Sequence, residues 1–125
     1  MKMYEILDLQ VLYTSIANIK LPLKTTYKFT RLMRRAEEEI SFYQEKFREI
    51  VEEYGVKEED GQYKLTQDGQ SIVIIPGKEV ECNTKLAELR NLDVPIDDIK
   101  FSIEELEKID VSISELSCLM SLIED

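Results

Sequence analysis

Histidine and tryptophan are absent from the sequence, and glycine occurs only four times. Without histidine there is no imidazole to serve as the base of a serine or cysteine triad, as a nitrogen ligand for a metal, or as a general base near neutral pH. The few glycines form neither a GxGxxG nor a GxxxxGKS/T loop, so a phosphate-binding loop is unsupported. These absences predict a protein that is not an enzyme and that uses no cofactor.

Long apolar runs are also missing, since no stretch reaches the roughly 18 residues that a membrane-spanning helix needs. The segment Met1–Asp8 carries acids too early for a signal peptide. The two cysteines, Cys82 and Cys118, are far apart and form no CxxC pair, which favours two buried thiols over a disulfide. The sequence therefore predicts a cytoplasmic protein that makes no contact with a membrane.

The remaining composition is ordinary for a folded protein, because 43% of the 125 residues are hydrophobic and 34% are charged. This length predicts a single domain, residues 1–125, with one core. The charge is unevenly spread. Residues 1–35 hold seven Lys or Arg against two acids, which gives +5, whereas residues 36–125 hold nine against twenty-four, which gives −15.

One long amphipathic helix is predicted from about Thr26 to Tyr54. Its apolar residues recur in steps of four and three, the pattern of a seam that faces another helix: Phe29, Met33, Ala36, Ile40, Tyr43, Phe47, Ile50 and Tyr54. Gly55 follows at once, where a left-handed residue commonly ends a helix. Two interpretations of the seam stay open: it covers the protein's own core, or part of it contacts a second chain.

Shorter elements flank this helix. The pattern predicts a helix over Leu7–Asn18, with a short strand over Lys2–Leu7 as the alternative. Residues 62–65 and 71–75 surround an Asp-Gly turn and predict a β-hairpin. A helix is also expected over Glu79–Leu92. Its expected inward-facing residues are Val80, Thr84, Ala87 and Leu89.

The C-terminal third predicts short elements. Val94–Phe101 alternates apolar residues and is a candidate strand. Ser102 with Glu105, and Ser112 with Glu115, have the spacing of capping boxes, so each predicts the start of a helix. Together the elements predict an α+β fold, mainly α: a helical hairpin with one long amphipathic helix, a small β-hairpin and short C-terminal helices.

Several acids gather before and within the first of these helices: Asp93, Asp97, Asp98, Glu104 and Glu105. Carboxylates of this kind suit a hard cation such as calcium. The spacing nevertheless lacks the DxDxDG pattern and the turn glycine of a calcium loop. We therefore interpret these residues as loop charge and as helix N-terminal acids that favour the helix dipole, and we predict no metal site.

The sharpest feature is a basic stripe along the start of the long helix: Lys20, Lys24, Lys28, Arg31, Arg34 and Arg35. Pairs with Glu38 and Glu39, four residues beyond the two last arginines, would offset part of the cost of cations at a helix N-terminus. Three interpretations stay open. The stripe pairs with the chain's own acidic C-terminal half, docks on an acidic protein or a second copy, or binds nucleic acid, which the −15 of the remainder disfavours.

The run from Lys20 to Phe29, with its Leu-Pro-x-Lys-Thr-x-Tyr-Lys segment, leads into a charged helix that ends Glu53-Tyr54-Gly55. An Asp-Gly turn and a final Ser112-Ile113-Ser114-Glu115-Leu116 element follow. In these features the chain resembles a group of small uncharacterised proteins encoded by bacteriophages and prophages of Gram-positive bacteria. The resemblance implies a phage or prophage context and carries over no activity and no site.

The expected function is therefore that of a phage-encoded accessory protein that acts by protein–protein contact, as a virion-associated or assembly component, with the basic stripe as its docking face. The partner is a protein, with a second copy as one candidate. The expected location is the cytoplasm of the bacterial host, with the virion as the alternative. The alternative function is an acidic inhibitor, a DNA mimic directed at a host nucleic-acid enzyme or defence system, because residues 93–125 hold ten acids against Lys100 and Lys108.

Overall fold

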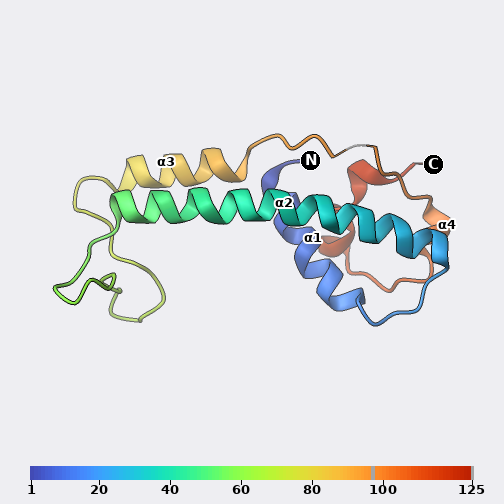
Figure 1. The fold of residues 1–125 in the computed structure, drawn as a ribbon, viewed down its shortest axis with the longest axis horizontal. Coiled ribbons are helices and arrows are strands. Elements are labelled where there is room, and N and C mark those ends of the chain that lie inside the picture. Colours follow the sequence, from blue (N-terminus) through green and yellow to red (C-terminus); the bar gives the residue numbers. More distant parts are fainter. Residues whose placement is uncertain (97, 125) are drawn as a thin grey trace. The chain divides into compact units, whose positions relative to one another are not determined.

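The computed structural model describes residues 1–96 and 98–124. Over these residues the chain forms five α-helices and a short 3-10 helix: α1 (Met3–Ile16), α2 (Leu23–Tyr54), α3 (Glu79–Arg90), α4 (Ile103–Leu106), α5 (Ile113–Ser117) and η1 (Met120–Leu122) (Figure 1). The mainly α fold that the sequence predicts is therefore confirmed. None of the helices in the described ranges is long and apolar enough to cross a membrane.

The chain divides into two compact units, which are described separately. Unit 1 comprises Met1–Ser41 and Leu92–Asp125, and unit 2 comprises Phe42–Asn91. The division falls within α2, so the first part of that helix belongs to unit 1 and its last turns belong to unit 2. The expectation of a single domain stays a prediction.

In unit 1, α1 begins earlier than the sequence predicts. The Lys2 backbone N–H donates to the Glu5 carboxylate at 2.9 Å, which caps the helix at its first turn. The apolar stripe also starts earlier, because Met3 and Ile6 are fully buried whereas Val11 is exposed. The alternative of a strand over Lys2–Leu7 is wrong, since only Lys2 makes a β-bridge, to Asp93.

The long helix α2 is confirmed, and it starts three residues before the predicted Thr26. The Thr26 N–H donates to the Pro22 carbonyl at 3.0 Å, so the proline stands at the helix start, where its missing N–H costs nothing. Four seam residues lie buried in unit 1: Phe29, Met33, Ala36 and Ile40. That half of the seam therefore covers the protein's own core.

The C-terminal part of unit 1 packs on the same core. Between α3 and α4 the chain buries Val94, Ile96, Ile99 and Phe101, and the Phe101 ring lies 4.5 Å from the Phe29 ring, centroid to centroid. The candidate strand over Val94–Phe101 is absent from its described residues, where only Phe101 makes an isolated bridge, to Ile123. Both predicted capping boxes are confirmed, at the starts of α4 and α5.

In unit 2, α3 runs back alongside the last turns of α2 (Figure 1). The Lys85 ammonium lies 3.3 Å from the Glu53 carboxylate and over the Tyr54 ring. The predicted inward face of α3 is mostly wrong, because Val80, Thr84 and Ala87 are exposed. The three apolar residues that unit 2 does bury are Tyr54, Cys82 and Leu89.

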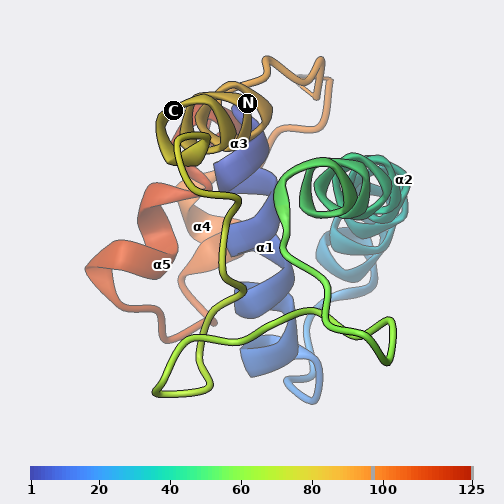
Figure 2. The ribbon, with the colours of Figure 1, turned by 90° about the vertical axis from the view of Figure 1, so that its left-hand side faces the viewer.

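The predicted β-hairpin is not confirmed, since unit 2 contains isolated β-bridges and no sheet. Figure 2 shows the segment between α2 and α3 as a looping coil. Three residues form a ring of backbone hydrogen bonds there, each 2.8–2.9 Å long. The Val56 N–H donates to the Val73 carbonyl, the Val73 N–H donates to the Lys64 carbonyl, and the Lys64 N–H donates to the Val56 carbonyl. The Val56 peptide thus replaces one of the two hydrogen bonds that Lys64 and Val73 would exchange in a β-ladder. The pairing between the two segments is therefore limited to the single bridge from Leu65 to Ile72.

Candidate partner-binding surfaces

Half of the basic stripe is used inside unit 1. The Lys28 ammonium lies 2.7 Å from the Glu105 carboxylate. The Arg35 guanidinium forms an ion pair with Asp98 and also donates to the Pro95 carbonyl. Arg31 lies 3.9 Å from the same aspartate.

For Lys28, Arg31 and Arg35, these contacts agree with one of the three interpretations of the stripe, namely that it pairs with the chain's own acidic C-terminal half. Partner binding by the stripe stays a prediction. The same contacts also correct the expected i,i+4 pairs. Arg35 forms its ion pair with Asp98 and not with Glu39. Among the described residues, Arg34 makes no ion pair with Glu38.

The Glu105 carboxylate is the centre of the most elaborate of these contacts. One of its oxygens accepts from Lys28 Nζ at 2.7 Å and from the Ser102 N–H at 3.0 Å, and the other accepts from the buried Thr25 hydroxyl at 3.3 Å. The bond from Lys28, followed by that from Ser102, lowers the pKa of Glu105 from its usual 4.5 to about 2. We name these four residues the Glu105 clamp. It fastens α4 to the first turns of α2.

The rest of the stripe stays exposed together with two large apolar side chains. Lys20, Lys24 and Arg34 are exposed and make no ion pair or hydrogen bond with the residues that the structure describes. Leu23 is 84% exposed and Tyr27 is 61% exposed on the same part of the helix. These five residues are called the basic face below. It combines apolar anchors with unpaired cations.

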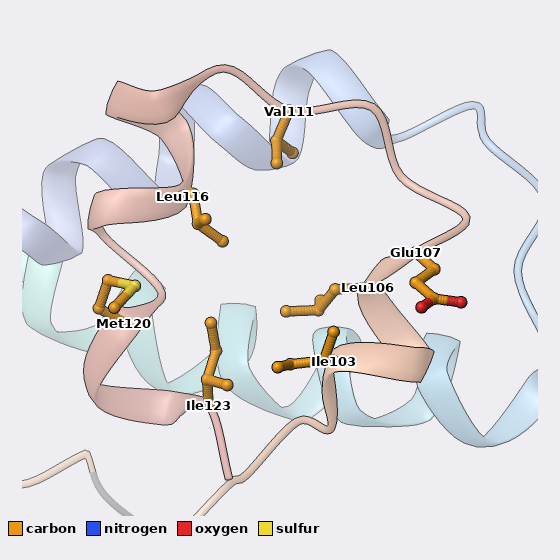
Figure 3. Close-up of a pocket in the computed structure, with 7 residues that line it drawn as sticks. All are labelled: Ile103, Leu106, Glu107, Val111, Leu116, Met120 and Ile123. Carbon is orange, nitrogen blue, oxygen red and sulfur yellow. The ribbon is translucent and has the colours of Figure 1, made fainter. Parts of the chain in front are cut away.

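A pocket of about 480 Å³ opens between α4 and the C-terminal helices (Figure 3). Its lining is Ile103, Leu106, Glu107, Val111, Leu116, Met120 and Ile123. All of these side chains except Glu107 are apolar, and in Figure 3 they converge on one open space from α4, the following loop, α5 and the end of the chain. We call this hollow the C-terminal pocket.

The pocket exists because two very short helices cannot cover their own apolar residues. The helices α4 and α5 have four and five residues, little more than one turn each. Ile103 remains 56% exposed and Met120 60% exposed at the mouth of the pocket. Glu107 lines the outer edge of the pocket at the end of α4, and in Figure 3 its carboxylate points away from the open space. It makes no ion pair with the described part of the chain.

Unit 2 carries a second, shallower apolar hollow of about 350 Å³. Its lining is Tyr43, Gln44, Phe47, Arg48, Val51, Tyr63 and Ile72. The Tyr43 and Phe47 rings stack with their centroids 5.9 Å apart, and Phe47 stays partly exposed. The C-terminal half of the predicted seam is therefore only partly covered within its unit.

Three of the five acids that could suit a hard cation form ion pairs with separate cations. Asp93 lies 2.8 Å from the Lys2 ammonium, whereas Asp98 and Glu105 pair with residues of α2. Asp97 lies outside the described residues. Within the described ranges no group of three or more Cys, Asp or Glu side chains is placed to hold a metal ion.

Both thiols are buried and free, as predicted. Burial raises the pKa of Cys118 to about 11 and also raises that of Cys82. A thiolate is the nucleophilic form of cysteine, so neither residue is poised for chemistry near neutral pH.

Comparison with known proteins gives no relative: no protein-family model, no curated protein and no solved structure matches the chain. The resemblance to small phage and prophage proteins therefore stays a prediction.

The C-terminal pocket is not among the features that the sequence predicts. The signal for it was present, because residues 103–123 hold more large apolar side chains than two one-turn helices can bury. The capping boxes gave the positions where these helices start, but not how short they are. A pattern of apolar residues alone does not distinguish a covered face from an open one.

Proposed function

We propose that the protein acts by binding another protein and that the C-terminal pocket is the main contact. The observation that carries the proposal is the pocket's lining, in which six apolar side chains surround about 480 Å³ and a single carboxylate, Glu107, stands at the rim. An apolar centre with a polar edge is the usual composition of a protein–protein contact. Met120 at the mouth adds a flexible, polarizable side chain that adapts to a partner's surface.

The basic face is the second proposed contact, in a narrower form than the stripe that the sequence predicts. Lys28, Arg31 and Arg35 are neutralised within unit 1, so they have little charge to offer a partner. Lys20, Lys24 and Arg34 keep theirs. Exposed cations beside exposed apolar groups favour an acidic protein surface, and the net charge of −10 disfavours nucleic acid.

The proposed setting is that of a phage-encoded accessory protein in the cytoplasm of a bacterial host, in virion assembly or in the virion itself. The support for this setting is the resemblance carried by the segment from Leu21 to Lys28. The Glu105 clamp gives that segment a structural purpose, because its Thr25 and Lys28 hold α4 in place.

The alternative of an acidic DNA mimic has less support. A mimic needs free carboxylates on one continuous face, whereas Asp93, Asp98 and Glu105 are each neutralised by a cation of unit 1. Six acids remain in residues 93–125 besides these three and Glu115, which accepts hydrogen bonds from Ser15 and Ser112. We therefore favour contact through apolar groups.

The substitution Met120→Glu tests the proposed contact. It places a charge at the mouth of the pocket on a side chain that is already mostly exposed, so the fold should tolerate it. We expect affinity capture from a lysate of phage-carrying Gram-positive cells to retain a protein on the wild type and to lose it on this variant, because a desolvated carboxylate opposes burial of the pocket.

Ile113→Glu is the matched control. Ile113 is 89% exposed on α5 and does not line the pocket, so the same added charge should leave capture unchanged. Equal capture by Met120→Glu and the wild type would remove the pocket from the proposal.

A further inference from the structure

The C-terminal pocket sets chemical requirements for what fills it. Its walls are apolar, so the occupant must insert one or two large apolar side chains. Glu107 at the rim carries no ion pair within the described residues, so a cation beside the apolar anchor would be favoured there. The occupant is therefore an apolar anchor with a lysine or arginine next to it.

This chain displays such a segment itself. In the basic face, Leu23 is an almost fully exposed anchor, and Lys24 and Lys20 stand beside it in the sequence without ion pairs to the described residues. Tyr27 follows one turn later on α2. The basic face and the pocket both remain open in the same molecule, so the chain does not satisfy either of them internally.

The two surfaces belong to the same unit and lie on two sides of α4. On one side of α4, a hollow of about 350 Å³ is lined by Pro22, Lys24 and Thr25 together with Glu104 of α4 and Lys108 just beyond it. The pocket uses the other residues of α4 and its end, Ile103, Leu106 and Glu107. When two molecules are related by a two-fold axis, the basic face of each can therefore contact the pocket of the other.

Charge supports the same pairing. Residues 1–35 carry +5, whereas residues 93–125 carry ten acids and two lysines, or −8. Three ion pairs inside unit 1 use part of this charge: Lys2–Asp93, Lys28–Glu105 and Arg35–Asp98. With these pairs set aside, residues 1–35 keep a net +2 and residues 93–125 a net −5, so the two segments still differ in sign. The net −10 of each molecule opposes association, but at physiological salt the Debye length of about 8 Å screens charges outside the contact and leaves those within it effective.

We propose that the occupant of the C-terminal pocket is a second copy of this chain, which inserts Leu23 of its basic face and places Lys24 against Glu107. In a two-fold pair this contact forms twice. The inference rests on the proposed function and names the partner for the same site.

Charge reversal on either side tests the pairing by sedimentation velocity. The wild type should dimerise, and Lys24→Glu and Glu107→Lys should each weaken self-association by about tenfold or more, because each variant puts two like charges into both contacts. An equimolar mixture of the two variants should restore the dimer, since every contact in a mixed pair again joins opposite charges. Lys64→Glu and Glu59→Lys make the same reversals on exposed residues of unit 2 and should dimerise as the wild type does.

The outcomes separate the inference from the proposed function. A wild type that stays monomeric, or a mixture of variants that fails to recover the dimer, overturns the second copy as occupant. If the monomeric protein still captures another protein in a way that depends on Met120, the proposed function stands with a basic partner of different sequence. If Met120→Glu changes neither dimerisation nor capture, both proposals fall.

Discussion

At the scale of single residues, the Glu105 carboxylate is the best-defined group in the protein. Its side chain is only 17% exposed, and it accepts bonds from an ammonium, a peptide N–H and a hydroxyl. A buried carboxylate is stable in its charged form only when it is satisfied in this way. Its pKa of about 2 expresses that preference for the charged form.

The clamp should make stability depend on pH in a defined direction. Because the folded pKa of Glu105 lies below its usual 4.5, the contribution is complete above that value and is lost as pH falls toward 2. We expect Glu105→Gln to lower the free energy of unfolding by about 1 to 3 kcal/mol at neutral pH, and the difference to shrink in acid. Urea unfolding of both proteins at pH 7 and near pH 2 measures it.

Glu107→Gln provides the matched control for this comparison. It removes one carboxylate from the end of the same helix, on an exposed residue without an ion pair to the described chain, and should change stability by less than about 0.5 kcal/mol. A constant difference between wild type and Glu105→Gln from neutral to acid pH would contradict the role given to the carboxylate.

Of the contacts in the Glu105 clamp, the sequence predicts the local one and not the two that join distant parts of the chain. The bond between Ser102 and Glu105 was predictable, because they stand three positions apart and a capping box has this fixed spacing. The bonds from Lys28 and Thr25 join residues 77 and 80 positions away. Charge alone left pairing of the basic stripe with the acidic half as one of three interpretations, and it did not predict which pairs would form.

At the scale of helices and turns, Gly55 has a purpose different from the predicted one. The glycines with a left-handed backbone are Gly61, Gly69 and Gly77, so Gly55 is not the expected left-handed cap. A Cβ at this position would instead lie 2.7 Å from the Val51 carbonyl oxygen and 2.9 Å from the Tyr63 ring. The glycine is required because backbone and ring approach it closely.

Gly55→Ala should therefore destabilise unit 2. The methyl group meets a carbonyl that belongs to the helix and cannot move away freely, so we expect a loss of about 1 to 3 kcal/mol in the free energy of unfolding. Urea unfolding followed by circular dichroism measures the loss. Gln44→Ala, at an exposed position of α2, should leave the midpoint nearly unchanged, and an equal midpoint for Gly55→Ala would show that the site relaxes.

Helices were predictable here because their signals are local. The seam of α2 and the capping boxes of α4 and α5 each depend on residues within a few positions of one another. The β-hairpin is not confirmed, because the decisive contact is not local. Lys64 and Val73 should bond to each other in both directions, but the Val56 peptide takes one bond from each.

At the scale of the whole molecule, the two units differ in how much core they bury. Unit 1 surrounds the apolar stripe of α1 and the buried Phe101 with residues from both ends of the chain. Unit 2 buries Tyr54, Cys82 and Leu89 and leaves an open hollow along α2. A small buried area gives a small hydrophobic contribution to stability, so unit 2 should open more easily.

The two buried thiols make this difference measurable, since Cys82 belongs to unit 2 and Cys118 to unit 1. In the native protein both should react slowly with an alkylating reagent, because burial raises the pKa of each thiol. As urea is increased, we expect Cys82 to become reactive at a lower concentration than Cys118. Mass spectrometry of the labelled peptides gives the two midpoints separately.

Equal urea midpoints for Cys82 and Cys118 would contradict this prediction. The two units would then unfold together, as the single domain predicted from the sequence would do. The midpoints are compared rather than the rates, because the higher pKa of Cys118 slows its reaction in the native state regardless of opening.

The ring formed by Val56, Lys64 and Val73 has a practical consequence for finding the partner. None of its three bonds includes a residue of the exposed turn at Gln67–Gln70. That turn is held by local hydrogen bonds to the Asp68 carboxylate. Such a turn accepts inserted sequence without loss of the surrounding backbone bonds. An epitope or fluorophore tag placed between Asp68 and Gly69 would sit in unit 2, leave the pocket and the basic face of unit 1 unmodified, and make the protein visible inside a living cell.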